Sequence, residues 1–459
     1  MRVSIDRSFR RNSSVRVLAD EASPLGDPGR RALLQSVARY GALVPAVYLL
    51  TGYDNFIRPA HSEPAAPHER GAADDPTSAA AQSEVRIVRD FADPYLELLR
   101  LLREATEIEH ALMLQYLYGA FSLKPEYEKL AGYGDPNATT ILGVAIQEMQ
   151  HLAIVNRFLV ALGAAPNVIP QDFPFEPEIY PFAFNLEPLS RATLAKYVYA
   201  EAPAGVLDWS VPQGEEAVFV NAIRSTLGPD AHVNHLGSLY SRIISSAREV
   251  RDARMPGLPD MTPWIAQLEA VKDQGEEDHY KLFRSVFMGT HEAFNGRPNP
   301  WNLPQLDPGY PAMPLAKNPS AYVGHERQIR NPTALSIAWL GNLHYWVVLC
   351  LLDLHFREQS AAELELARAH MQGPLWAVAR YLPSLGAGMP FDTLATGYAP
   401  GLSAAWSRRF VLQLLGEADR MERKIGDQNA LPDDFPTGVA SATAQTIRGE
   451  LEQYHASAR

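Results

Sequence analysis

The chain has 459 residues, of which 46% are hydrophobic, so it is long enough for two or three domains with large cores. Its net charge is -12, and lysine and arginine are scattered without a basic stripe. We therefore expect no nucleic-acid partner, because phosphate contacts supply most of that binding. The single cysteine, Cys350, lies in an apolar run and excludes a disulfide framework and a cysteine metal site.

Residues 1–88 are predicted to form an N-terminal arm that ends in a linker rich in Ala, Pro, Asp and Ser. No uninterrupted apolar run reaches the ~18 residues that a membrane helix needs, so we expect no integral membrane segment. The nearest run, 40–50, follows Arg30-Arg31 and loosely resembles a twin-arginine export signal, although Arg39 interrupts it. A cytoplasmic protein with a packing helix here is expected, and export through this signal is the alternative.

Helical periodicity begins at Asp93-Pro94, where Asp suits the N-cap and Pro suits the first helical position. Few segments alternate with a period of two, so the chain is predicted to be all-α. Residues 89–290 are predicted to form a bundle domain, 291–333 a connection rich in Pro and Gly, and 334–459 a C-terminal helical region. The individual helices are expected at 93–123, 135–163, 190 to the stop at Pro203, 233–252, 262–288, 334–358, 360–382, 403–426 and 438–456.

Acids and histidines occupy the middle of apolar helix faces in the predicted bundle. Glu109 interrupts a face that repeats every three or four residues from Leu98 to Gly119. A bare carboxylate there is unfavourable, because burying an unpaired charge costs several kcal/mol or shifts its pKa until it is neutral. The three other bundle helices place similar groups on their apolar faces: Glu148 and His151, then Glu201, then Glu276 and His279.

A bound pair of metal ions resolves this concentration of buried charge. Two divalent ions balance four carboxylates, and each Glu-x-x-His places an acid and an imidazole on one helix face. One Glu from each of two helices, with Glu-x-x-His from each of the other two, is the di-iron carboxylate arrangement. The sequence therefore predicts an all-α, ferritin-like four-helix bundle with additional C-terminal helices. It would hold two iron ions, with manganese as an alternative, on Glu109, Glu148, His151, Glu201, Glu276 and His279.

A third Glu-x-x-His, from Glu107 to His110, is rejected as a ligand pair, since Glu107 lies about 200° around the helix from Glu109. His110 is expected to make a polar contact at the bundle edge, with a supporting role beside the metal as the alternative. Tyr116 shares the face of Glu109 and is the candidate catalytic residue, with an ordinary core tyrosine as the alternative. Tyr240 carries the same two interpretations, weighted toward structure.

Two further alternatives concern the metal itself. Buried salt bridges without a metal would need basic partners on the apolar faces, and only Lys272 lies near such a face. His344 and His355 are eleven residues apart and share a helix face, so they could serve a second metal or a haem. Ordinary core or surface histidines are the favoured interpretation of that pair.

Several stretches resemble the ferritin-like domain of iminophenyl-pyruvate dimer synthases, which include the enzymes that couple tryptophan-derived imines in violacein and rebeccamycin biosynthesis. The bundle stretches are Glu109-His-Ala-Leu-Met-Leu-Gln-Tyr-Leu-Tyr, Gln147-Glu-Met-Gln-His-Leu-Ala, Tyr199-Ala-Glu-Ala-Pro, Gln274-Gly-Glu and His279-Tyr-Lys-Leu-Phe. Looser similarity follows at His370-Met, Leu382-Pro and Gly388-Met-Pro-Phe, so the resemblance spans roughly residues 90–395. Those synthases are longer chains and some contain haem, which keeps haem open as a cofactor although no Cys-x-x-Cys-His occurs here.

The resemblance and the metal ligands together imply a di-iron oxidoreductase or an imine-coupling enzyme. Its partner would be a small, amino-acid-derived substrate of secondary metabolism, and a homodimer is one open assembly. The alternatives are an iron-handling protein of the ferroxidase type and a metal-free structural bundle. Over a hundred extra helical residues and a long arm disfavour an iron store, because they would obstruct a cage of short bundles.

Overall fold

The computed structural model describes residues 87–169, 182–203, 206, 214–227, 236–394 and 403–457. Over these residues the chain is helical, and extended pairing is limited to two isolated bridges, Leu123 with Ala312 and Ser320 with Gln328. The predicted all-α class is therefore confirmed. The N-terminal arm and its export alternative lie outside the described residues.

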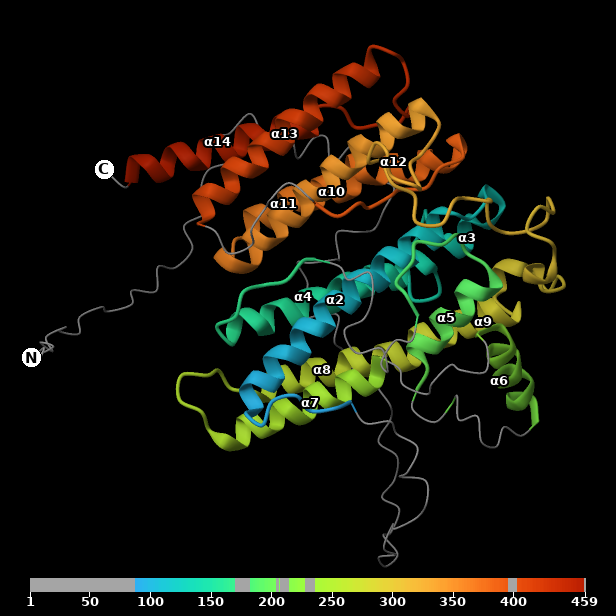
Figure 1. The fold of residues 1–459 in the computed structure, drawn as a ribbon, viewed down its shortest axis with the longest axis horizontal. Coiled ribbons are helices and arrows are strands. Elements are labelled where there is room, and N and C mark those ends of the chain that lie inside the picture. The colour runs from blue at the N-terminus through green and yellow to red at the C-terminus, as the bar shows by residue number, and fades with distance from the viewer. Residues whose placement is uncertain are drawn as a thin grey trace, which may run out of the picture.

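Four rows of helix form the predicted bundle (Figure 1). Helices α2 and α4 pack against each other along their length. A third row is nearly continuous, because α8 and α9 are joined by a π-helical turn, and the fourth row is shared by α5, which packs on α9, and α7, which packs on α8 and α2. Their bounds are Pro94–Phe121 (α2), Ile141–Ala161 (α4), Arg191–Glu201 (α5), Leu236–Ala253 (α7), Thr262–Gln274 (α8), Gly275–His279 (π turn) and Tyr280–Met288 (α9).

The predicted helix starts depend on capping residues, and two of three are confirmed. The Asp93 side chain accepts a hydrogen bond from the Leu96 amide at the start of α2, and Ser190 caps α5. The start expected at Asp135 is wrong, because Thr140 takes that role for α4 by accepting from the Gly143 amide. The residues before it form a turn in which the Asn137 amide donates to the Thr140 hydroxyl at 3.0 Å. Thr140 therefore ends the turn and starts the helix.

Two short helices were not expected. Helix α6, Gly214–Leu227, packs on α5, and α3, Glu128–Ala131, follows α2. In the range 291–333, predicted as a connection, the 3₁₀ turns Glu292–Phe294 and Pro300–Asn302 are the helical segments that precede the start of α10 at Pro332. This connection returns to the end of α2, where the Met313 amide donates to the Ser122 carbonyl at 2.8 Å.

The C-terminal helices form a second layer beside α2 and α4 (Figure 1). The single helix expected at 360–382 is wrong: it divides at a π-helical turn, Met371–Leu375, where Gly373 has non-helical dihedral angles and Pro374 has no amide proton to donate. The bounds in this layer are Pro332–Glu358 (α10), Ala361–His370 (α11), Trp376–Tyr381 (α12), Ala404–Gly426 (α13) and Val439–Ser457 (α14).

Helix α10 is long and apolar enough to cross a membrane by length and composition, and it is the one described helix that passes this test. The sequence analysis did not find it because polar residues such as Asn342 and His344 interrupt its apolar run. In the structure 78% of its most apolar window is buried, against α4, α11 and α13 among others. Packing inside the protein therefore accounts for its apolar surface.

The absence of a side chain at Gly388 allows the C-terminal layer to lie close to the bundle. A Cβ atom on Gly388 would lie 2.4 Å from the ring and hydroxyl of Tyr118, which projects from α2. The Tyr118 hydroxyl in turn donates to the carbonyl of Ala316 in the long connection. The Gly388-Met-Pro-Phe loop can therefore lie against α2 only because residue 388 has no side chain.

His344 and His355 share a face of α10, but the structure does not bring them together. His355 Nδ1 lies 2.7 Å from the carbonyl of Ser360 at the helix end. The Nδ1 of His344 instead lies 2.8 Å from the Nδ1 of His370 in α11, and His370 Nε2 lies 3.0 Å from the Thr443 hydroxyl in α14. One imidazole donates its proton and the other accepts, so this buried pair needs both rings neutral.

The buried histidine pair should make folding sensitive to acid. Burial lowers the pKa of His370 to about 3, and burial and His370 together hold the pKa of His344 well below its usual range. The unfolded chain takes up protons on both below pH ~6.5, so stability is present above that pH and is lost as the pH falls. Each imidazole contributes a slope of up to about 1.4 kcal/mol per pH unit.

This slope can be measured by urea unfolding between pH 7.5 and pH 5.0. The wild-type free energy of unfolding should fall more steeply toward acid than that of the double variant His344→Gln/His370→Gln, which has nothing to protonate at these positions. Equal slopes in the two proteins would show that the pair is not held neutral in the fold.

Candidate metal centre

Five of the six predicted ligands meet in the interior of the bundle, and all five are buried. They form two groups, and within each group the possible ligand atoms lie within 4.8 Å of one another. Glu148 belongs to both groups, so the two groups share one carboxylate. The groups are Glu109, Glu148 and His151, and Glu148, Glu201 and His279.

Glu148 lies between the two histidines. Its Oε2 is 2.9 Å from the Nδ1 of His151, and its Oε1 is 3.0 Å from the Nδ1 of His279. Each ring also faces one further acid: His151 Nδ1 is 3.6 Å from Glu109 Oε2, and His279 Nδ1 is 3.5 Å from Glu201 Oε2. The two halves are therefore alike, each with one acid and one imidazole around the shared carboxylate.

Two glutamines contact the imidazole rings of His151 and His279 at the nitrogen that points away from the carboxylates. His151 Nε2 lies 2.9 Å from the side-chain oxygen of Gln274, and His279 Nε2 lies 3.0 Å from that of Gln147. Since an amide oxygen only accepts, each ring donates from Nε2, which leaves Nδ1 toward the carboxylates as the ligand atom. The sequence analysis gave these glutamines no role, although each precedes an acid of the centre within two residues.

Two buried tyrosines hold the outer acids. The Tyr116 hydroxyl donates to Glu201, and the Tyr240 hydroxyl donates to Glu109. Tyr116, the candidate catalytic residue, thus touches a predicted ligand, although across the bundle from the acid of its own helix. Tyr240, which the sequence weighted toward structure, makes the equivalent contact in the other half. Glu109 has no basic partner on its own helix, so a hydrogen-bond donor from another helix was to be expected, and Tyr240 supplies it.

Buried atoms without partners test whether a metal pair fits. Glu109 Oε2, Glu148 Oε1, Glu201 Oε2 and His279 Nδ1 are inaccessible to water, and none has a hydrogen-bond partner among the described residues. Native proteins rarely leave buried polar atoms unpaired, since each costs about 1–3 kcal/mol. Each of the four atoms belongs to a residue of the two groups. Carboxylate oxygen and imidazole nitrogen are also the donor set that iron and manganese accept, so the residues fit a metal pair.

Burial and mutual repulsion perturb the ionisation of every group in the centre. Burial and then the charge of Glu148 raise the pKa of Glu109 to about 8. Burial acts the same way on Glu148, but His279 and His151 outweigh it and hold its pKa well below the usual range. Burial opposes charge on His279, yet Glu148 and Glu201 raise its pKa to about 9. Such opposed shifts in one cluster are typical of functional sites.

Glu276 is the predicted ligand that stands apart. It belongs to neither group, and its Oε2 lies 3.0 Å from the Nζ of Lys272, one turn earlier. The π-helical turn explains the difference, because its wider spacing rotates Glu276 away from the face that His279 occupies. Glu276 nevertheless lines a small cavity of about 10 Å³ beside Glu109 and His151, and its Oε1 is buried there without a partner among the described residues.

The backbone is irregular on the two sides of this small cavity. The π-helical turn interrupts the row formed by α8 and α9 at His279, and α5 ends opposite it at Glu201. The cavity lies at this break and is lined by residues of α2, α4, α5, α7 and α8. Because π turns inside α-helices occur frequently at functional sites, the geometry marks this side as the open side of the centre.

The rejected third Glu-x-x-His lies away from the centre. Glu107 accepts a hydrogen bond from the side chain of Asn167 at 2.9 Å. His110 faces the C-terminal layer, where its Nε2 is 2.9 Å from the hydroxyl of Tyr345, and burial lowers its pKa to about 3. His110 therefore makes the expected polar contact at the bundle edge.

The tyrosine contacts should matter for stability as well as for the metal. Tyr116→Phe and Tyr240→Phe each leave a buried carboxylate oxygen without its donor, which should cost about 1–3 kcal/mol in the metal-depleted protein. Urea unfolding followed by circular dichroism measures this loss. Tyr381→Phe, at a partly exposed position of α12, is the matched control and should be neutral. Losses no larger than the control's would mean that the hydroxyls do not hold the acids.

Comparison with known proteins supports the fold. A ferritin-like family matches residues 102–262, a range that includes Glu109, Glu148, His151 and Glu201 but ends before His279. No solved structure matches the chain. The match therefore covers three of the four helix rows that carry the predicted ligands.

Two curated relatives are enzymes. The chain is 27% identical over 344 residues to dichlorochromopyrrolate synthase of Lentzea aerocolonigenes, which covers 59% of this chain and 32% of that protein. It is 28% identical over 264 residues to 2-imino-3-(indol-3-yl)propanoate dimerase of Chromobacterium violaceum, covering 49% and 25%. The chain thus spans about a third or less of the length of these relatives. Residues 102–262 of this chain thus match the ferritin-like family, and the chain is similar to these two enzymes at modest identity.

Proposed function

We propose that this chain is an iron-dependent enzyme that oxidises, and thereby couples, a small imine derived from an amino acid. The observation that carries the proposal is the sharing of buried Glu148 between two groups of metal-ligating side chains. A carboxylate between two positions keeps two ions close, which favours a dimetal centre over two independent sites. Glu109 with His151, and Glu201 with His279, would complete the two positions.

A bound iron pair would supply electron transfer from the substrate to an oxidant such as O2. The chain's own residues prepare the site for this chemistry. Gln147 and Gln274 fix the ring orientation of the histidines, and Tyr116 and Tyr240 hold the outer acids. The complete burial of Glu148 excludes water from the shared positions.

Lys272 and Glu276 point to the substrate class. They lie on the open side of the centre, beside Glu109 and His151, and Lys272 is partly exposed. A 2-imino acid, the substrate named for the Chromobacterium violaceum relative, has a carboxylate next to its imine carbon. Lys272 would bind that carboxylate and release Glu276, whose free oxygen already faces the small cavity. Glu276 would then be a ligand that moves when substrate binds.

Metal content tests the centre. Protein loaded with ferrous iron without oxygen should hold two ions per chain, by elemental analysis. The Glu148→Ala variant should lose most of both iron ions, because the substitution removes the shared ligand. The His279→Ala variant should bind iron more weakly mainly at one of the two positions. Glu107→Ala, an acid on the same helix as Glu109 but bonded to Asn167, is the matched control and should keep two.

Circular dichroism confirms that the variants stay folded. Unchanged stoichiometry in both ligand variants would refute the assignment. Iron uptake far above two ions per chain in air, with a large hollow assembly by light scattering, would instead support an iron store.

Turnover tests the reaction. The iron-loaded chain should convert 2-imino-3-(indol-3-yl)propanoate, generated from tryptophan by an amino-acid oxidase, into a coupled dimer detected by mass spectrometry. Lys272→Met should raise KM at least about tenfold, since a charge-assisted hydrogen bond contributes about 1.5–3 kcal/mol, while Lys281→Met, an exposed lysine of α9, should not. Substrate loss without dimer, at a rate that metal depletion leaves unchanged, would exclude coupling by this centre.

A further inference from the structure

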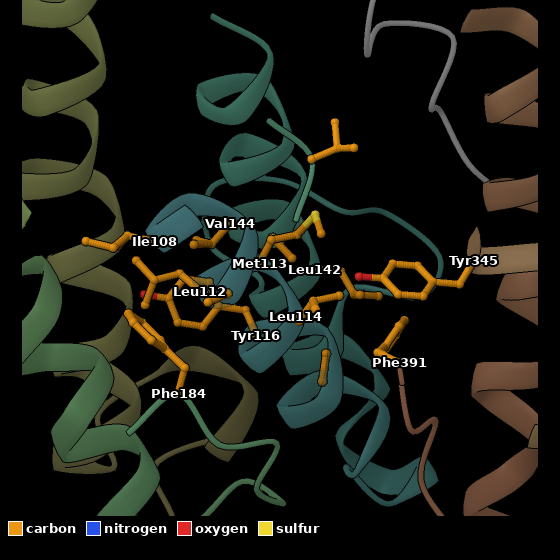
Figure 2. Close-up of a cluster of buried hydrophobic side chains, with 14 of the residues drawn as sticks. Ile108, Leu112, Met113, Leu114, Tyr116, Leu142, Val144, Phe184, Tyr345 and Phe391 are labelled. Carbon is orange, nitrogen blue, oxygen red and sulfur yellow. The ribbon is translucent and has the colours of Figure 1, made fainter. Parts of the chain in front are cut away.

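A second and larger cavity lies between the bundle and the C-terminal layer. Its volume is about 160 Å³, and apolar side chains of α2, α4, α10 and α12 form most of its lining. Figure 2 shows Leu114 and Leu142 of the bundle on the side that faces Tyr345 and Phe391 of the C-terminal layer. An apolar cavity of about 150 Å³ in another protein binds benzene, so this one has room for one aromatic ring or a short alkyl chain.

This cavity is separate from the metal centre. Several α4 residues that line it, among them Ile146, Ala153 and Arg157, lie on the side of the helix away from Glu148. On α2, Tyr116 donates to Glu201 of the centre, and Figure 2 shows it on the side of Phe184, while Leu114 lies toward the C-terminal layer. Helices α2 and α4 thus divide the two spaces. The C-terminal helices therefore help to form a cavity, but not one that opens directly on the predicted ligands.

Arg368 gives this apolar cavity a cationic end. It lies in α11, lines the cavity, and is only 9% exposed. One of its nitrogens, NH1, donates to the exposed Glu365, while its Nε and NH2 are buried with no hydrogen-bond partner among the described residues. An arginine presents its donors as a fork that matches a carboxylate, so two unpaired donors beside an apolar cavity suit an anionic head group.

A second guanidinium lies at the same cavity. Arg157 of α4 lines the same cavity, and it is near enough to lower the pKa of Arg368, after burial. Both arginines also lower the pKa of His355, another lining residue, after its burial. Glu365 raises the pKa of Arg368 and Glu363 raises that of His355, so these acids offset part of the positive charge, and the two unpaired donors of Arg368 carry the preference for an anion.

The backbone beside Arg368 is irregular in the way that often marks a binding site. The π-helical turn Met371–Leu375 begins three residues later, and Met371, Gln372 and Leu375 all line the cavity. A regular α-helix there would turn these side chains through different angles. The other π turn in the described residues lies at the metal centre, so both irregular turns border a cavity.

We propose that this cavity binds a small carboxylic acid that carries one aryl or short alkyl group. The carboxylate would accept hydrogen bonds from Nε and NH2 of Arg368, and the apolar group would lie between α2, α4 and α10. This site is separate from the reaction centre and does not rest on the proposed function. Occupation would fill the interface between the bundle and the C-terminal layer, and so stabilise their packing.

Calorimetric titration of the full chain with 3-phenylpropanoate and with its neutral amide tests this site. The acid should bind saturably with one site per chain, and the amide at least about tenfold more weakly, because it lacks the charge. The Arg368→Gln substitution should weaken binding of the acid by a similar factor and leave the affinity for the amide unchanged. Arg420→Gln, an exposed arginine on α13 that pairs with Glu417, is the matched control and should change neither.

Leu352→Trp, which places a larger side chain in the lining, tests the location even if Arg368→Gln folds poorly, and it should block the acid. Circular dichroism and thermal unfolding check that each variant is folded. The proposal is overturned if neither compound binds saturably, or if acid and amide bind equally. It is also overturned if the acid binds to Leu352→Trp as it does to the wild type, because the carboxylate would then occupy another place.

Discussion

Glu148 is buried completely and contacts both histidines of the centre, so the charges of the other centre residues are arranged around this carboxylate. A single buried acid without partners would be protonated, because burial disfavours its charged form. Here two imidazoles flank it, two further acids flank the imidazoles, and each outer acid has a tyrosine. The charges are therefore arranged as an alternating chain, in which every member requires the next. The glutamines beyond the rings complete this chain and fix which nitrogen faces inward.

The helical rows could be predicted from the sequence because their apolar faces are long and their caps are ordinary. Asp93 and Ser190 cap the helices that they were expected to cap. The acids and histidines of the centre were visible because they interrupt these faces, and five of six come together. Glu276 does not, because a π turn cannot be seen in a periodicity counted at 100° per residue. The division of the 360–382 helix at Gly373 was not predicted for the same reason, because a π turn also lies there.

Contacts between distant segments could not be predicted from one helix face at a time. The tyrosine on Glu201 comes from α2, and that on Glu109 comes from α7. His344 was paired with His355 by spacing, yet His370 of a neighbouring helix is its partner. The cavity with Arg368 arises where α4, α10 and α11 meet. In each case helix packing selects the partner, and local sequence only supplies the candidates.

Crystals of iron-loaded protein, examined by anomalous diffraction at the iron absorption edge, test the central claim most directly. The account predicts two iron peaks inside the bundle, on either side of the Glu148 carboxylate, one beside Glu109 and His151 and the other beside Glu201 and His279. A single peak, or iron bound only outside the bundle, would contradict it.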